Sequence, residues 1–273
     1  MTANNICIII FLLPFTVTSV AKAELSKEQL YSLYNQANES FRKANSTLDS
    51  EQAKRDYERA ILNFERIIEE GQVKNAGLYY NLANAYLLQE QLGKAILNYR
   101  KALQLDDSDE NIQKNLAFAR SKRFDKIPVQ TEKRIMQTLF FWHYDFLLKT
   151  KFFLACIFFG MTCISITATI GFGKNTARTT LILVCSILCL CFLSSVAIEH
   201  KVRTSKMCGV ITSKQVTARQ GDGDNYAPSF KESLHEGTEF DLVESRTDWI
   251  HIRLSDNNDA WIPKNSVELI TID

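Results

Sequence analysis

Apolar and small residues recur every three or four positions between residues 79 and 107, in the stretch YYNLANAYLLQEQLGKAILNYRKALQLDD. The pattern is interrupted once near its middle, where Gly93 lies. A spacing of three and four residues places side chains on one face of an α-helix. The stretch therefore predicts two helices joined by a turn. Small side chains at Ala83 and Ala95 would let the helices approach closely, and aromatic side chains would fill the space beside them.

This pattern fits the 34-residue tetratricopeptide repeat (TPR) over residues 76–109. One departure is Asp107, which stands where the repeat commonly has proline. The positions expected to build the repeat are Tyr79, Leu82, Ala83, Tyr86, Ala95, Tyr99 and Ala102.

Less regular copies of the pattern flank this repeat. Upstream, YNQANESF and YERAILNFERII supply Ala37 and Ala60, which are 23 residues apart, against 12 for the equivalent pair of the regular repeat. We therefore expect an insertion that lengthens a helix or the turn. Downstream, ENIQKNLAFARSKRF repeats a first-helix pattern with Leu116 and Ala117. A single repeat cannot bury its own apolar face, so this segment predicts a cap helix, and residues 24–124 are expected to form two repeats plus the cap.

Two runs without charge follow, at residues 152–172 and 179–198. At 1.5 Å per residue, each is long enough to cross a hydrocarbon core of roughly 30 Å. Residues 173–178 between them form only a short loop, so the pair predicts a transmembrane helical hairpin. The alternative is a pair of buried helices in a soluble protein.

The N-terminus carries a third apolar run, at residues 6–20, which is short for a spanning helix. It ends at Ala21-Lys22-Ala23, a small-x-small cleavage site. We interpret residues 1–23 as a signal peptide, with an uncleaved anchor as the alternative. Cleavage would place residue 24 onward outside the cytoplasm.

Residues 125–151 begin as a linker and become amphipathic. Trp142 and Tyr144 suit a lipid–water interface, so we expect an interfacial helix before the first span. His143 and Asp145 could instead form a proton-handling pair. Lysines and arginines flank the spans on the side of the soluble segments, and positive-inside counting would place that side in the cytoplasm. We follow the signal peptide, which places both soluble segments outside.

After the second span the pattern changes to short alternating strands separated by turn residues, with clear runs at 216–219, 239–243, 249–254 and 260–262. Five such strands in about 60 residues suggest a small SH3-like barrel at 207–273, with Trp249 and Trp261 in its core or at its rim. The predicted fold is a multidomain membrane protein that contains an α-helical TPR array, a two-helix transmembrane hairpin and a small all-β SH3-like barrel.

Charge and cysteine usage narrow the possible functions. Residues 24–133 contain 17 lysines and arginines and 17 aspartates and glutamates. The corresponding numbers are 8 and 2 at residues 134–206, and 6 and 12 at residues 207–273. The positive excess surrounds the hairpin, where it can meet anionic lipid head groups, and neither soluble segment is basic enough to predict nucleic-acid binding. Cys208 is the one cysteine in an aqueous segment, which excludes a disulfide framework there.

Motifs for catalysis, cofactors or metals are absent from the sequence. It contains no H-E-x-x-H, no G-x-x-x-x-G-K-[ST], no G-x-S-x-G and no C-x-x-C pair with metal spacing. The acidic cluster at 106–110 ends one helix and opens the next, where carboxylates meet a helix dipole favourably. We therefore expect a protein that is not an enzyme and needs no cofactor or metal.

The order of segments resembles that of the BatE-like proteins, the TPR members of the bacterial Bat (Bacteroides aerotolerance) group. The tail LHEGTEFDLVESRTDWIHIRLSDNNDAWIPKNSVELI is similar to the bacterial SH3 pattern at Leu234, Gly237, Thr238, Trp249, Ile252, Trp261 and Ile262. The stretched first repeat and GDGDNYAP, in place of an R-x-x-P turn, depart from that family. The resemblance implies a scaffold in the bacterial inner membrane that faces the periplasm and works beside von Willebrand A-type Bat proteins in oxidative-stress tolerance or envelope integrity.

Binding is therefore the leading class of function, and the inner surface of the array is the expected site. The candidate partner-binding residues are Tyr80, Asn84, Leu87, Asn38, Lys114 and Phe118. We expect this face to take a peptide or helix of another protein. Two alternatives remain: an envelope anchor whose SH3-like domain binds peptidoglycan, and a redox protein acting through Cys156, Cys163, Cys185, Cys189 and Cys191.

Overall fold

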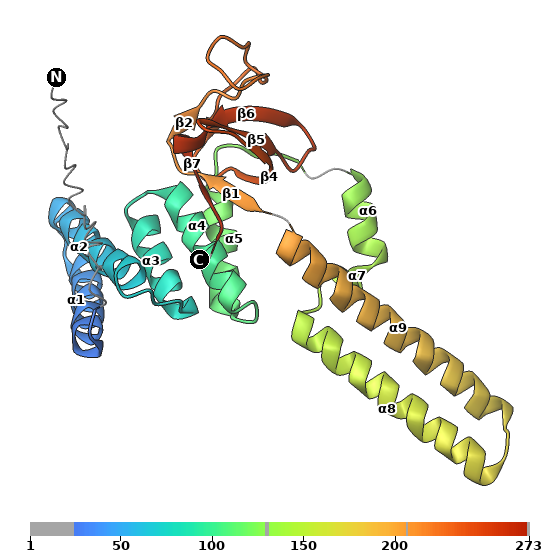
Figure 1. Cartoon of the computed structure of the whole chain (residues 1–273). Helices are drawn as coiled ribbons and strands as arrows, with labels where there is room; N and C mark the ends of the chain where they lie inside the picture. Colours follow the sequence, from blue (N-terminus) through green and yellow to red (C-terminus); the bar gives the residue numbers. More distant parts are fainter. Residues whose placement is uncertain (1–24, 129–130, 206, 272–273) are drawn as a thin grey trace, which may run out of the picture.

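The computed structural model describes residues 25–128, 131–205 and 207–271 (Figure 1). The segment interpreted as a signal peptide lies outside these ranges. Within them, a helical array, a helical hairpin and a C-terminal antiparallel sheet follow one another along the chain.

The array begins with two long helices, α1 (Lys27–Ser46) and α2 (Ser50–Glu69). Ser26 opens α1 with a capping box, and the Asp49 side chain accepts hydrogen bonds from the first turn of α2, so both starts are fixed by sequence. Each helix has 20 residues, against 13 and 14 in the next pair. The expected insertion thus lengthens both helices of the first pair.

The regular repeat forms α3 (Ala76–Leu88) and α4 (Leu92–Leu105), followed by α5 (Glu110–Ser121). All of its predicted building positions are buried: Tyr79, Leu82, Ala83, Tyr86, Ala95, Tyr99 and Ala102. On α5 the buried residues are Ile112, Leu116 and Ala119. Of the two positions that repeat the first-helix pattern, Leu116 is buried and Ala117 is exposed. The buried positions of α5 are spaced by four and three residues, and Ala117 falls outside that stripe.

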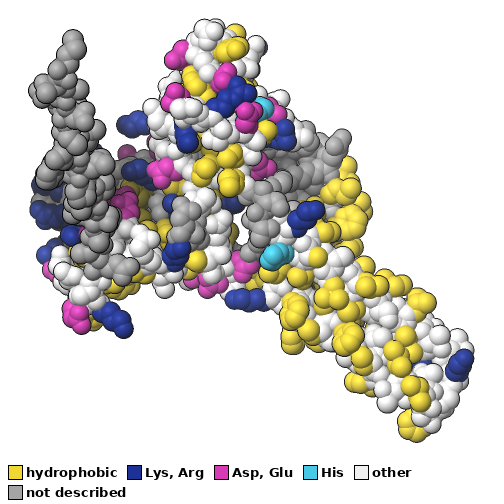
Figure 2. Space-filling view, in the orientation of Figure 1, with side chains coloured by type: hydrophobic (Ala, Val, Ile, Leu, Met, Phe, Trp, Pro, Cys, Tyr) yellow, Lys and Arg dark blue, Asp and Glu magenta, His cyan; other side chains and the backbone are white. Residues whose placement is uncertain are grey.

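Two short helices, α6 (Thr131–Leu139) and α7 (Phe141–Tyr144), lead into the hairpin of α8 (Leu148–Phe172) and α9 (Thr176–Ser205). The most apolar windows of α8 and α9 have mean hydropathies of 2.1 and 2.8 and are only 11% and 22% buried. Core helices of a soluble protein would be mostly buried. Figure 2 shows apolar side chains along the outside of the hairpin, so these two helices are long and apolar enough to cross a membrane.

A buried ion pair joins the hairpin at the end nearest the soluble part. Lys151 is 1% exposed, and its Nζ donates to Glu199 Oε2 and to the backbone oxygen of His143, each at 2.5 Å. His143 Nδ1 lies 2.6 Å from Ser195 Oγ. His143 therefore contacts α9 through Ser195, which ties α7 to the hairpin.

The C-terminal β domain contains β1 (Cys208–Ile211), β2 (Gln215–Val216), β3 (Leu234–His235), β4 (Glu239–Ser245), β5 (Trp249–Arg253), β6 (Asp259–Pro263) and β7 (Val267–Leu269). Five strands form one antiparallel sheet in the order β6-β5-β4-β1-β7, and β2 pairs with β3 separately. The edge strands β6 and β7 do not pair with each other in this sheet, so it does not close into the expected barrel. Ile211, Ile250, Ile252 and Ile262 fill its core.

The β domain packs directly on the helical array, next to α4 and α5 (Figure 1). Val210 of β1 and Ile270, which follows β7, belong to the same buried cluster as Ile96 and Leu97 of α4. The array and the β domain thus share a hydrophobic core, while the hairpin projects away from both (Figure 1).

Candidate functional site

Helices α1 and α3 carry matching positions when Ala37 is aligned with Ala83. Tyr34 then corresponds to Tyr80, and Asn38 to Asn84. Tyr31 and Tyr34 are 69% and 40% exposed. We call the surface formed by these positions of α1 and α3, together with Lys114, Asn115 and Phe118 of α5, the first-helix face.

The middle of the first-helix face is an internal hydrogen-bond network. The Asn115 side-chain amide donates to Tyr80 Oη at 3.0 Å and to Asn84 Oδ1 at 2.9 Å. The buried hydroxyl of Tyr99 donates to Asn84 Oδ1 at 2.5 Å. Burial is the main reason that the pKa of Tyr99 lies far above its ordinary value, so this phenol remains a hydrogen-bond donor.

Tyr80 and Asn84 therefore join α3, α4 and α5, although the sequence suggested that they were left over for a partner. Both remain half-buried, so part of each side chain lies at the surface. Leu87 is also half-buried and packs against the core of the array. The amide of Asn38 donates to Tyr34 O at 3.0 Å, within its own helix.

The α5 side of the face is more open. Phe118 is 53% exposed, and Lys122 Nζ lies 5.1 Å from its ring centroid. Lys114 is exposed and pairs with Glu110 at 2.8 Å. Phe118 follows Asn115 by three residues, so it lies on the same side of α5 as the network. An aromatic side chain beside two lysines can hold apolar and acidic groups of a ligand.

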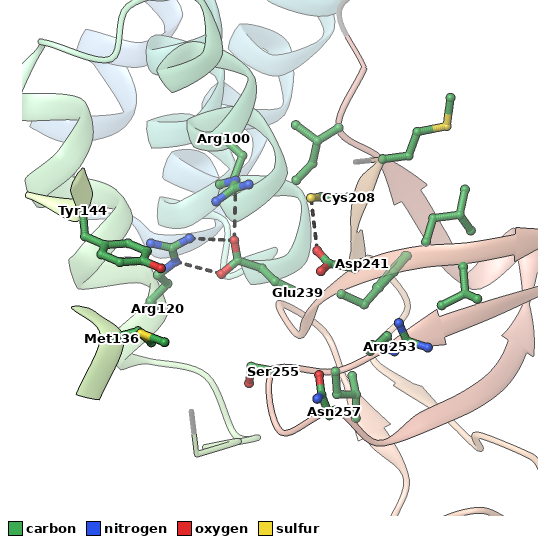
Figure 3. Close-up of a pocket in the computed structure, with 16 residues that line it drawn as sticks. Arg100, Arg120, Met136, Tyr144, Cys208, Glu239, Asp241, Arg253, Ser255 and Asn257 are labelled. Carbon is green, nitrogen blue, oxygen red and sulfur yellow. Dashed lines mark hydrogen bonds and ion pairs between the residues drawn. The ribbon is translucent and has the colours of Figure 1, made fainter. Parts of the chain in front are cut away.

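One carboxylate of the β domain, that of Glu239, gathers several arginines of the array. Arg120 of α5 donates two hydrogen bonds of 2.8 Å to Glu239 at the start of β4 (Figure 3). Arg123 approaches the same carboxylate at 3.4 Å. Arg100 of α4 adds an ion pair at 3.6 Å. Burial alone would raise the pKa of Glu239, but the hydrogen bonds from Arg120 and the nearby guanidiniums outweigh it and hold the pKa below 4.5.

A second carboxylate links the chain after α5 to the β domain. Asp125 accepts hydrogen bonds from His235 N at 2.6 Å and Thr238 Oγ1 at 2.7 Å, and it pairs with His235 Nδ1 at 2.9 Å. Burial opposes its ionisation, but these donors together hold its pKa below 3.8. The ring of Phe124 lies 4.2 Å from that of His235.

Two glycines allow the close approach of α4 to the β domain. A Cβ on Gly93 would lie 2.5 Å from the Ile211 carbonyl oxygen, and one on Gly237 would lie 3.0 Å from Ile96 Cδ1. Gly237 also has a φ of +85°, which favours glycine. The sequence suggested a turn at Gly93 and a bacterial SH3 motif at Gly237, but not this shared interface.

The remaining candidates stand apart from these contacts. Trp249 is half-buried in β5, and Trp261 packs with His251, whose ring is stacked at 4.8 Å, and with the guanidinium of Arg246 at 4.4 Å. Among the described residues, no cluster of three histidine, cysteine or acidic side chains could hold a metal ion. What these surfaces offer chemically is binding through aromatic, amide and charged groups.

Comparison with known proteins identifies one element of this architecture. The sequence pattern of the tetratricopeptide repeat family matches residues 76–109, which correspond to α3, α4 and the connection between α4 and α5. No curated protein matches the chain. Repeats of this family typically form protein-binding scaffolds and carry no catalytic residues. Residues 76–109 are therefore a tetratricopeptide repeat within a helical array.

Proposed function

We propose that this chain is a non-enzymatic, membrane-anchored scaffold whose first-helix face binds a segment of a partner protein. The observation that carries the proposal is the exposure of Tyr31, Tyr34 and Phe118, at 69%, 40% and 53%, on helices α1 and α5 of a TPR-containing array. Large exposed aromatic side chains on one face of a repeat array favour a binding surface. The β domain covers part of α4 and α5 and leaves these residues open.

The partner segment is an extended or helical peptide that contains apolar side chains. Tyr31, Tyr34 and Phe118 would pack against those side chains, and the exposed parts of Tyr80 and Asn84 would hydrogen-bond its backbone. Lys114 and Lys122 beside Phe118 favour an acidic residue at that end of the segment. The network that joins α3, α4 and α5 keeps the surface rigid, which lowers the entropy cost of binding.

The resemblance to BatE-like proteins supplies the more specific form of this proposal. In it, α8 and α9 span a bacterial inner membrane, the array and β domain face the periplasm, and the partner is a von Willebrand A-type protein of the Bat group. Two spans return the chain to the side from which it entered, so the array and the β domain lie on one side. Their shared core supports the same arrangement.

Peptidoglycan binding by an SH3-like domain is less favoured as a function. The β domain has twice as many acidic as basic residues, 12 against 6, and Trp261 already packs against Arg246 and His251. An aromatic ring engaged in this way offers less surface to a sugar.

A pull-down of the full chain from solubilised membranes tests partner binding. We expect Tyr31→Ala/Phe118→Ala to reduce partner recovery by about tenfold or more, since buried aromatic anchors commonly contribute 2 kcal/mol or more to binding. The matched control is Leu62→Ala/Tyr226→Ala, which removes two exposed side chains from the outer side of α2 and from the β domain. Equal recovery with both double variants would contradict the proposal.

A further inference from the structure

A cavity of about 800 Å³ lies where the array, the segment before the hairpin and the β domain meet (Figure 3). Arg100 and Arg120 form part of its wall, Met136 of α6 and Tyr144 of α7 another part, and β4 a third. Its volume is within the range of about 300–1,000 Å³ typical of small-molecule sites. Neither the repeat nor the first-helix face accounts for it.

The polar part of this cavity carries a surplus of positive charge. Arg100, Arg120 and Arg123 converge on the single carboxylate of Glu239. Arg253 also lines the cavity but is balanced by two hydrogen bonds to Asp259. Arg123 and Asp259 pair with lining residues but do not line the cavity themselves. With these two and the lining residue Asp241 included, the group contains four guanidiniums and three carboxylates. A partly buried surplus charge is stabilised by an anion.

Arg100 is the guanidinium most available to such an anion. Its Nε lies 3.6 Å from Glu239 Oε1, too far for a hydrogen bond, whereas Arg120 binds the same carboxylate with two bonds of 2.8 Å. Among the described residues, no hydrogen-bond acceptor pairs with the Arg100 side chain, which is 29% exposed. Its planar array of donors suits phosphate.

The other part of the cavity wall is apolar and close to the hairpin. Met136, Met207 and Val243 are 51%, 57% and 43% exposed. Met207 comes shortly after the end of α9, and Tyr144 lies four residues before the start of α8. If α8 and α9 span a membrane, the cavity therefore opens near the membrane surface, with apolar side chains beside its charged wall.

We propose that this cavity binds the head group of an anionic phospholipid, with the lipid phosphate on Arg100 and the first part of the acyl chains against Met136, Met207 and Val243. This inference rests on the proposed membrane placement of α8 and α9. The lipid neutralises the surplus charge and covers exposed methionines in one step. It also fixes the array and β domain against the membrane surface, which orients the first-helix face.

Native mass spectrometry of the full chain, purified from membranes in mild detergent, tests the site. We expect the wild-type chain to retain about one anionic phospholipid and to release zwitterionic phospholipid. Arg100→Gln should lower occupancy about tenfold, the loss expected for one charge-assisted hydrogen bond, while Arg120 still holds Glu239. Val243→Trp should reduce occupancy by filling the apolar wall. Arg66→Gln removes the same charge from an exposed position on α2 and should leave occupancy unchanged.

Three results would overturn the proposal: no retained anionic lipid in the wild type, equal retention of zwitterionic lipid, or wild-type occupancy in both cavity variants. Saturation of the cavity by inorganic phosphate without lipid would overturn it as well. Membrane fractionation of the same chain tests the anchoring separately. A chain that sediments with membranes but fails the lipid test contradicts this site and leaves the scaffold proposal standing.

Discussion

Glycine at position 93 determines how closely α4 approaches the β domain. It is the second residue of α4, and a Cβ there would meet the backbone of Ile211 at 2.5 Å and of Thr212 at 2.9 Å. Backbone atoms of a sheet cannot move aside as a flexible side chain can. Gly77 is the second residue of α3, and a Cβ there would meet only the Asn75 side-chain oxygen, at 3.2 Å. The same substitution at the two sites should therefore have opposite effects.

We predict that Gly93→Ala destabilises the docked unit and that Gly77→Ala does not. Alanine gains about 0.5–1 kcal/mol over glycine within a helix, but overpacking costs about 1–3 kcal/mol. The net expectation at residue 93 is a loss of about 1–2 kcal/mol, seen as a lower Tm of the full chain in detergent. Similar melting temperatures for the two variants would show that α4 does not approach the β domain this closely.

Glu239 acts at the same interface through charge. Its pKa is held below 4.5, so its carboxylate stabilises docking above the unfolded-state pKa, and this contribution is lost as pH falls through the lower, folded-state pKa. The contribution of Asp125 to stability depends on pH in the same direction, because its pKa is held below 3.8 in the folded state. Docking should therefore weaken below about pH 4.

We predict that Glu239→Gln lowers stability at neutral pH by about 3–5 kcal/mol, because it leaves three partly buried guanidiniums without their carboxylate. Between about pH 5 and pH 3, the Tm of the variant should also fall less than the Tm of the wild type. Glu232→Gln removes an exposed carboxylate from the same domain and is the control. A wild-type pH profile in Glu239→Gln would refute the role of this ion cluster.

At the scale of elements, α3 to α5 are tied together by polar side chains as well as by apolar packing. Asn84 accepts hydrogen bonds from Tyr99 and from Asn115, which belong to different helices. Tyr99 is fully buried, so its hydroxyl cannot turn to bulk water if Asn84 is removed. The network therefore sets the spacing of the helices that form the first-helix face.

We predict that Asn84→Ala lowers the free energy of unfolding by about 1–3 kcal/mol, the cost of a buried donor without an acceptor. Asn81→Ala is the control, since Asn81 lies one turn earlier on α3 and makes no side-chain hydrogen bond among the described residues. The measurement is chemical or thermal unfolding followed by circular dichroism. Equal stability of the two variants would mean that the network contributes little. Tyr31 and Phe118 are therefore better positions than Asn84 for testing partner binding.

The helices were predictable where local spacing determines them. Small and aromatic residues at fixed intervals predict α3 and α4, and the absence of charge over two long runs predicts α8 and α9. The lengths of α1 and α2 were less accessible, since an insertion of 11 residues can extend helices or a turn equally well. On α5, Leu116 is buried and Ala117 is exposed, because a cap helix buries only one of its sides.

The interface between the array and the β domain could not be predicted in this way. Arg120 and Glu239 are 119 residues apart, and ion pairs over such distances follow no local period. Gly93 was visible in the sequence, but glycine near a helix start also fits an ordinary turn. The candidate site was predictable only in part, because its internal contacts also follow no local period. Repeat spacing identifies its positions, whereas only the packing of α5 reveals that Tyr80 and Asn84 are already engaged.

At the scale of the whole molecule, the array and β domain form one unit on a helical hairpin. The array and the β domain share a buried cluster and are joined by the side chains of Glu239 and Asp125. The first-helix face therefore has a fixed orientation relative to the β domain. A scaffold benefits from this arrangement, because a rigid face loses little entropy when a partner binds. We therefore expect a partner to bind at one defined face of the array.

Site-specific photo-crosslinking in intact cells tests this claim most directly. A photoreactive residue is placed at Tyr31, at Phe118 or, as the control, at Leu62, which is 54% exposed on α2. We predict the same discrete cross-linked partner from positions 31 and 118 and none from position 62. A product of equal yield at position 62, or the absence of any product at both first-helix positions, would contradict a partner-binding first-helix face.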